Sequence, residues 1–144
     1  MTSGHITQGE ELIPIKIKMT IQGDKILYDL SGSYSYIGCF LNVSSGTSFS
    51  TMVGGTKAPF SRITLNSVCY SVLETRLPES SVVNAALYPI AFSGFCSDAY
   101  EKIMNAIFEL WSNLVPEQAI DCYFNMGFFL VGGRDKHKAY NNKN

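Results

Sequence analysis

Charged residues are scarce in this 144-residue sequence: they make up 16% of it, and 11 basic residues nearly cancel 12 acidic ones. A chain without a basic excess has no general field that attracts phosphate backbones or anionic lipids. No apolar run reaches the ~20 residues that cross a bilayer, and the first residues lack the pattern of a secretory signal. The sequence therefore indicates no nucleic-acid and no membrane partner, and it favours a cytoplasmic protein, with non-classical secretion left open.

Cysteine and histidine are also few. The four cysteines are far apart, form no Cys-x-x-Cys pair and could be joined as ligands only by His5 and His137. Because structural zinc sites need closely spaced thiolate or imidazole ligands, we predict no metal site and no cofactor. Each cysteine lies in an apolar run, which favours buried free thiols. Two disulfides remain the alternative; the cysteines are Cys39, Cys69, Cys96 and Cys122.

What the chain does have is apolar residues, which make up 46% of it and can bury one sizeable core. The polar residues 1–11 read as a flexible leader, and the polar, Asn-rich residues 136–144 read as a flexible tail. Residues 12–135 are then expected to form a single α+β domain.

The clearest local pattern is the alternation of apolar and polar residues over positions 12–22. Period 2 predicts a strand with its Ile and Met side chains on one face and Lys16 and Lys18 on the wetter face. Gly23-Asp24 suits a tight turn, and alternation resumes at residues 26–30. A β-hairpin is the simplest interpretation.

Apolar residues at helical spacing from Tyr100 to Leu114 predict a long amphipathic helix, with Asp98 and Glu101 as a capping box and Pro116 as its end. A shorter helix is expected after Pro78 and before Pro89. Further strands are predicted at residues 36–43, 60–73 and 117–125, with a loop at 44–48 and a turn at 52–59. The expected fold is α+β: a mixed β-sheet with the long and the short helix packed on one face.

Few residues suggest chemistry. Gly54-Gly55-Thr56-Lys57 resembles part of a phosphate-binding loop, but the upstream glycine and the Gly-Lys-Ser/Thr order are missing, so a turn is favoured. Lys16 and Lys18 could face an anion, although exposed lysines usually only solvate a sheet. No nucleophile can be assigned without a base beside it.

One ordered set of segments resembles a known family. Tyr36-Ile37-Gly38-Cys39-Phe40-Leu41-Asn42, then Met52 to Pro59, then Ile63 to Val68 are similar to the strand, turn and strand of the macrophage migration inhibitory factor family of the tautomerase superfamily. Residues 100–114 look like that family's second helix, and residues 119–133 look like its closing strand and tail. The resemblance covers about half of the chain and implies a homotrimer.

The resemblance also implies a site, and the sequence departs from it there. Family members use an N-terminal proline as the base, whereas Pro14 is internal and would act only after cleavage behind Ile13. Lys16, Val68 and Ile120 would fall at substrate-binding positions. We therefore expect a non-catalytic, cytokine-like protein acting through protein contacts. The alternatives are a keto-enol tautomerase processed to Pro14, and a small inhibitor or immunity-type interaction protein.

Overall fold

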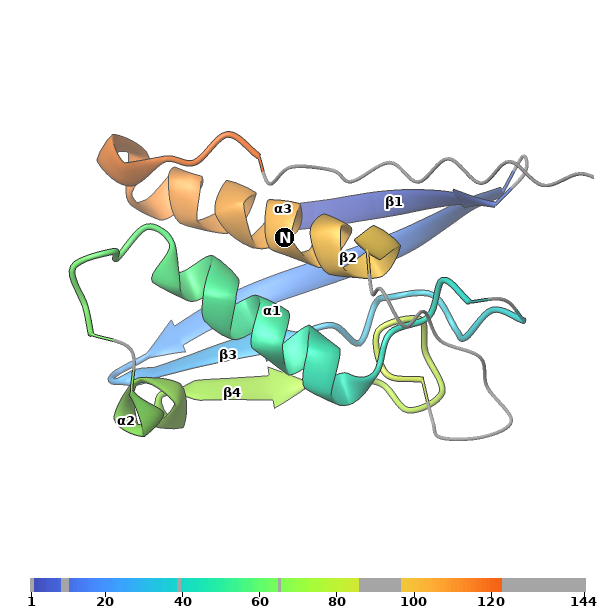
Figure 1. The fold of residues 1–144 in the computed structure, drawn as a ribbon, viewed down its shortest axis with the longest axis horizontal. Helices are drawn as coiled ribbons and strands as arrows, with labels where there is room; N and C mark the ends of the chain where they lie inside the picture. The colour runs from blue at the N-terminus through green and yellow to red at the C-terminus, as the bar shows by residue number, and fades with distance from the viewer. Residues whose placement is uncertain (1, 9–10, 39, 65, 86–96, 123–144) are drawn as a thin grey trace, which may run out of the picture.

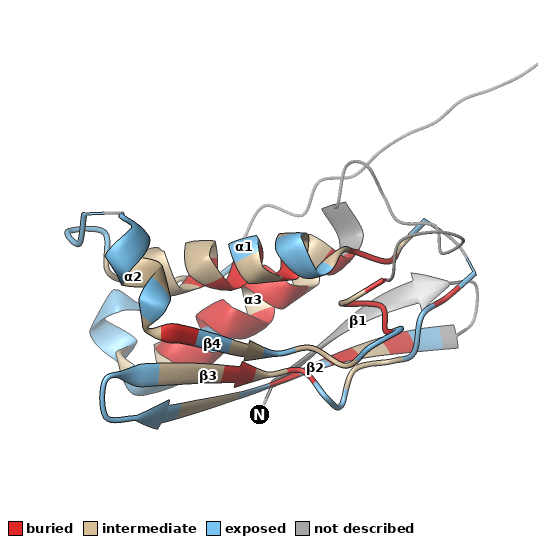
Figure 2. Ribbon diagram, turned by 90° about the horizontal axis from the view of Figure 1, so that it is seen from below, coloured by how far each residue is buried: buried red, intermediate tan, exposed pale blue. Residues whose placement is uncertain are grey.

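The computed structural model describes residues 2–8, 11–38, 40–64, 66–85 and 97–122, with the backbone alone described at 2–8, 11, 97 and 98. In these segments a four-stranded sheet carries two main helices over one face (Figure 1), and a view along the sheet shows the two layers (Figure 2). The elements are β1 (Thr2–Gln8), β2 (Glu11–Gln22), β3 (Lys25–Asp29), α1 (Ser45–Lys57), α2 (Ser67–Ser71), β4 (Leu73–Arg76), α3 (Ser97–Leu114) and the 3₁₀ turn η1 (Pro116–Gln118).

The sheet is mixed, with strand order β1-β2-β3-β4. β1 pairs antiparallel with the first half of β2, and β3 pairs antiparallel with its second half. β4 runs parallel to β3, so the chain must cross over between them, and α1 and α2 lie in that crossover. The predicted α+β class and mixed sheet are confirmed.

The predicted hairpin is confirmed as β2 and β3. Ile13, Ile15 and Ile17 are fully buried, whereas Lys16 and Lys18 on the opposite face are exposed. Gly23 has a φ of +59°, a conformation that side chains disfavour, which explains a glycine at the start of this two-residue turn. The burial of alternate side chains ends before β2 does, since Ile21, near the turn, is 51% exposed.

The predicted long helix is confirmed as α3. Its stripe of buried side chains lies against the sheet and α1 and includes Ile103, Met104, Ile107, Leu110 and Trp111. Leu114, at the end of the same stripe, is 54% exposed, so the apolar pattern extends beyond the packed face. The proposed capping residue Asp98 lies outside the described side chains.

The second helix of the layer is α1, where the sequence analysis expects a loop and a turn. Ser, Thr and Gly dominate α1 and are weak helix formers, so packing rather than propensity stabilises it. Ser44 caps its first turn by accepting the Thr47 N–H at 3.2 Å, and the Ser48 hydroxyl donates to the Val83 carbonyl at 2.6 Å.

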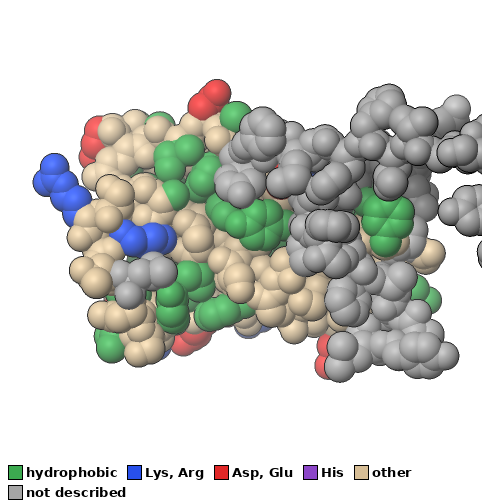
Figure 3. Space-filling model, in the orientation of Figure 1, with side chains coloured by type: hydrophobic (Ala, Val, Ile, Leu, Met, Phe, Trp, Pro, Cys, Tyr) green, Lys and Arg blue, Asp and Glu red, His purple; other side chains and the backbone are tan. Residues whose placement is uncertain are grey.

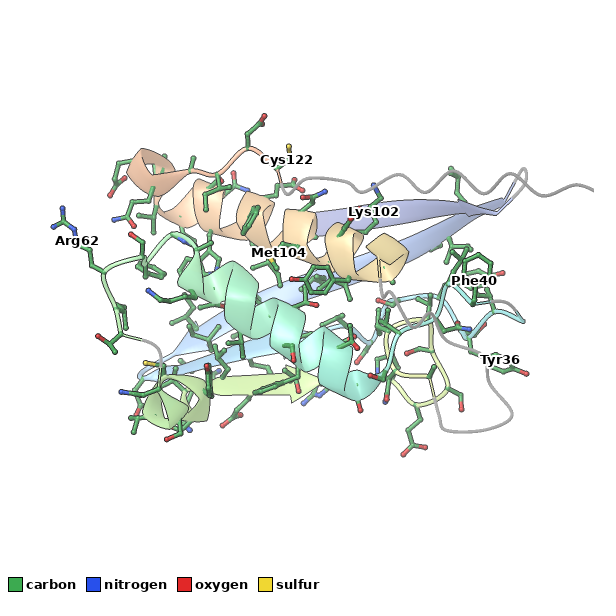
Figure 4. All side chains as sticks on the ribbon, in the orientation of Figure 1. Tyr36, Phe40, Arg62, Lys102, Met104 and Cys122 are labelled. Atoms are coloured by element: carbon green, nitrogen blue, oxygen red, sulfur yellow. The ribbon has the colours of Figure 1, made fainter. Side chains whose placement is uncertain are left out.

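Gly54 and Gly55, expected in a turn, instead let α1 approach α3. A Cβ added to Gly55 would lie 2.8 Å from Ile107 Cγ2 and 3.2 Å from Met104 Sδ. Figure 4 shows Met104 between the two helices. The glycine pair is therefore a helix-packing feature.

Three other predicted strands are wrong within the described residues. Residues 36–38 and 40–43 form a loop, closed by the buried Asn42 side chain, which accepts the Ile37 N–H and donates to the Ile37 carbonyl. Within 60–73, Asn66 caps α2 by accepting the Val68 and Cys69 N–H groups, and only Leu73 belongs to a strand. Residues 117–122 form part of η1 and irregular chain, and 123–125 lie outside the described residues.

Two further expectations differ from the structure. Residues 2–8, expected to be a flexible leader, form β1 and pair with β2 along their whole length. The short helix expected after Pro78 is absent from residues 79–85, which form turns and isolated bridges, and its remainder lies outside the described residues. The predicted tail at 136–144 also lies outside them.

Candidate functional site

A pocket of about 340 Å³ opens where the end of α1, the following loop, α2 and the β3–β4 edge meet α3. Its walls are mostly apolar, and Phe60 and Trp111 meet edge to face in it, with ring centroids 5.0 Å apart. This volume and lining are typical of small-molecule sites. The lining residues are Ile26, Val53, Thr56, Lys57, Phe60, Ile63, Cys69, Tyr70, Val72, Leu73 and Trp111.

A chain of hydrogen bonds runs behind one wall of the pocket. Trp111 Nε1–H donates to the Tyr28 hydroxyl at 3.0 Å, and the Thr56 hydroxyl donates to the Met52 carbonyl at 2.7 Å. Because Thr56 has one proton and uses it on Met52, the 2.7 Å bond between Tyr28 and Thr56 must be donated by Tyr28. Thr56 Oγ1 is thus fixed as an acceptor toward Tyr28.

The same environment keeps Tyr28 protonated. Burial raises the pKa of the Tyr28 phenol above its usual value of 10.0, and the hydrogen bonds with Thr56 and Trp111 oppose that rise only in part. At physiological pH the Tyr28 phenol therefore stays neutral and can donate its hydrogen bond to Thr56 Oγ1. The network is therefore a fixed support for the pocket wall.

Lys57 is the cationic residue in the pocket lining. Its Nζ donates to the carbonyls of Phe60 and Ser61, both at 2.7 Å, which uses two of its three protons. Figure 3 shows Lys and Arg side chains beside hydrophobic ones at the α2 end of the described surface. Arg62 in the same loop extends away from the molecule (Figure 4).

The residues suggested by sequence resemblance do not gather at this pocket. Lys16 lines a separate shallow hollow with Lys18, Asp29, Ser31 and Gly32. Val68 is 70% exposed on α2, and Ile120 follows η1. Pro14 lies inside β2, opposite His5 of β1, and its carbonyl accepts the Tyr34 N–H at 3.0 Å.

The pocket is not predictable from the sequence, although Thr56 and Lys57 belong to a noticed motif. Both residues are expected in a turn, whereas they lie on the last turn of α1. Phe60, Val72 and Trp111 come from segments interpreted as strand or core. Only the crossover between β3 and β4 brings these segments together, and no local motif signals that arrangement.

Possible metal ligands and thiols are sparse among the described residues. Those segments contain no group of three His, Cys, Asp or Glu side chains placed to hold a metal ion. Cys69 and Cys122 are free thiols, half-buried and exposed respectively, so the expected full burial is wrong for both. Cys39 and Cys96 lie outside the described residues. No helix in the described part of the chain is long and apolar enough to cross a membrane.

Fold and pocket together define a mixed-sheet α+β protein with an apolar site sized for a small molecule. The chain belongs to the hydantoinase B/oxoprolinase family, whose model matches residues 1–143. No curated protein and no solved structure matches the chain.

This match overturns the resemblance to the macrophage migration inhibitory factor family and the cytokine-like function inferred from it. The segments that carried that resemblance also have different structures. Residues 36–38 and 40–42 belong to a loop and residues 52–57 are helical, where the resemblance required a strand and a turn. The expectation of a homotrimer depended on that resemblance and is not carried further. The proposed processing at Pro14 loses its basis for the same reason.

Proposed function

We propose that this chain contributes a substrate-binding pocket to an enzyme of the hydantoinase B/oxoprolinase family, and that the pocket holds a five-membered cyclic amide. The family's name refers to hydantoin and oxoproline, and both rings contain an amide N–H. The observation that carries the proposal is the apolar pocket with Thr56, whose hydroxyl is fixed as an acceptor, among its lining residues. The ring carbons would contact Phe60, Val53 and Trp111, and the ring N–H would donate to Thr56.

Blocking the pocket tests the proposal most directly. Val53→Phe places a larger side chain in the lining and fills part of the space that the ligand would occupy. The ligand 5-phenyl-2-pyrrolidinone then loses apolar contact with the pocket, so it should bind at least about tenfold more weakly. Val68→Phe makes the same change at a 70% exposed position and should leave affinity unchanged. Binding is followed by NMR titration of the protein. Equal affinity in wild type and Val53→Phe would refute the location of the site.

A second ligand pair tests the role of Thr56. The lactone 5-phenyl-γ-butyrolactone has a ring oxygen in place of the N–H, so it faces the Thr56 acceptor without a proton to donate. It should bind roughly tenfold more weakly than the lactam. Thr56→Ser, which keeps the hydroxyl, should retain this preference, whereas Thr56→Val should lose it. If the lactone binds as well as the lactam, the acceptor role is wrong.

A further inference from the structure

The strand β4 lies at the margin of the sheet and has β3 on one side only (Figure 1). The carbonyls of Val72 and Arg76 accept the N–H groups of Ile26 and Leu30, both at 2.9 Å, and therefore face β3. Because backbone groups alternate in direction along a strand, those of residues 73, 75 and 77 face away from β3. Within the described part of the chain, no strand pairs with this outer edge. Such an edge is a template for pairing with another strand.

The residues along this edge are arranged symmetrically about Thr75, in the order Leu73-Glu74-Thr75-Arg76-Leu77. Leu73 and Leu77 both pack on the core, on the face of the sheet that the helices cover. Glu74 and Arg76 alternate with them on the opposite face, where their side chains are 57% and 65% exposed. A two-fold axis through Thr75 and perpendicular to the sheet would therefore place each glutamate opposite an arginine. It would also place each leucine opposite a leucine.

From this geometry we infer that β4 is a dimerisation edge, and that it pairs antiparallel with β4 of a second copy of this chain, centred on Thr75. The Thr75 residues of the two copies would exchange both of their backbone hydrogen bonds, which uses the groups that face outward. The two four-stranded sheets would join into one continuous sheet with the helices of both copies on the same face. Such a contact is isologous and closed, as in most homodimers. The inference does not depend on the proposed function.

The charges select this register against others. Antiparallel pairing centred on Glu74 would bring two carboxylates together, and pairing centred on Arg76 would bring two guanidinium groups together. Parallel pairing in register would do both. Like charges directly opposite each other destabilise a strand pair, whereas opposite charges stabilise it. A short, charged edge normally prevents pairing, and here the same charges leave one arrangement favourable.

The contact is small, so the dimer is expected to be weak. Stable interfaces usually bury about 1,200–2,000 Å², more than one short strand pair supplies, which favours a Kd in the micromolar range or above. Sedimentation equilibrium from about 1 to 500 μM protein covers this range. Wild-type protein should change from monomer to dimer as its concentration rises.

Charge reversal tests the register. Glu74→Arg and Arg76→Glu each leave only like charges across the edge, so each variant should associate at least about tenfold more weakly than wild type. An equimolar mixture of the two variants restores opposite charges in both cross-strand pairs and should associate about as well as wild type. Damage to the fold of either variant would not be repaired by mixing. Lys16→Glu makes the same charge reversal at an exposed position on β2 and should associate like wild type.

Amide hydrogen exchange tests the edge without any variant. The Thr75 N–H should exchange quickly in dilute wild-type protein and become protected as concentration rises, because the second copy supplies its acceptor. The Ile26 N–H, which already donates to the Val72 carbonyl, should be protected at every concentration.

Four results would overturn the inference. Wild-type protein could stay monomeric at every concentration, the charge-reversal variants could associate as well as wild type, or their mixture could associate no better than either alone. The fourth is protection of the Thr75 N–H at every concentration, since another part of the same chain would then cover the edge.

Discussion

Replacing Gly55 with Ala tests the close packing of α1 on α3. The new Cβ would lie 2.8 Å from Ile107 Cγ2, 3.1 Å from Ile107 Cβ and 3.2 Å from Met104 Sδ. Carbon atoms in contact normally sit about 3.5–4.0 Å apart, so something must move by several tenths of an ångström. Ile107 is fully buried, so its side chain has no free space to move into and the two helices must separate.

The expected magnitude follows from two opposing terms. Overpacking a well-packed core costs about 1–3 kcal/mol, and exchanging Gly for Ala inside a helix returns up to about 1 kcal/mol. Because Ile107 cannot yield, we expect a net loss of about 1–2 kcal/mol in the free energy of unfolding. Urea unfolding followed by fluorescence of the single Trp, Trp111, measures it.

Two other glycines of α1 provide matched controls. A Cβ at Gly46 would meet only Ser44 Oγ at 3.9 Å, so Gly46→Ala should stabilise by a few tenths of a kcal/mol through helix propensity. A Cβ at Gly54 would lie 3.3 Å from Met104 Cε, the flexible end of its side chain, so Gly54→Ala should fall between the other two. Equal stability of Gly55→Ala and Gly46→Ala would show that α1 and α3 are not closely packed at Gly55.

Three other predictions concern polar groups. Tyr28→Phe removes the acceptor of the buried Trp111 N–H and should cost about 1–3 kcal/mol. Burial raises the pKa of the Tyr28 phenol, so the stability contributed by the neutral phenol is complete below the usual value of 10.0 and is lost as pH rises above it. Urea unfolding between about pH 8 and 11 should therefore show a smaller alkaline loss of unfolding free energy in Tyr28→Phe than in wild type. Asn42→Ala leaves the Ile37 N–H and carbonyl unpaired and should cost about 2–3 kcal/mol, whereas an unchanged urea midpoint would show that the loop does not need this side chain. Hydrogen bonds from Ser31, and then Arg76, lower the pKa of Asp29 below 3.8. The stability contributed by the ionised carboxylate is therefore present above pH 3.8 and is lost as pH falls through the lowered pKa. Asp29→Asn should lose less unfolding free energy than wild type on acidification, measured by urea unfolding at a series of acidic pH values.

The sequence by itself determined the β2–β3 hairpin and α3, because both follow from local periodicity. Ile13, Ile15 and Ile17 repeat at period 2, and Ile103, Ile107 and Trp111 repeat at helical spacing, so each element carries its own buried face. Gly23 at the turn completes the local description.

Only the tertiary structure decided α1, β4 and the pocket. The Ser, Thr and Gly residues of α1 favour a loop when taken alone, and the helix exists because Gly54 and Gly55 fit against α3 and Ser48 bonds to Val83. β4 forms only by pairing in parallel with β3 across the crossover. Thr56, Lys57 and Trp111 meet as a consequence of that packing, so the site depends on contacts between residues far apart in the chain, which sequence periodicity does not contain.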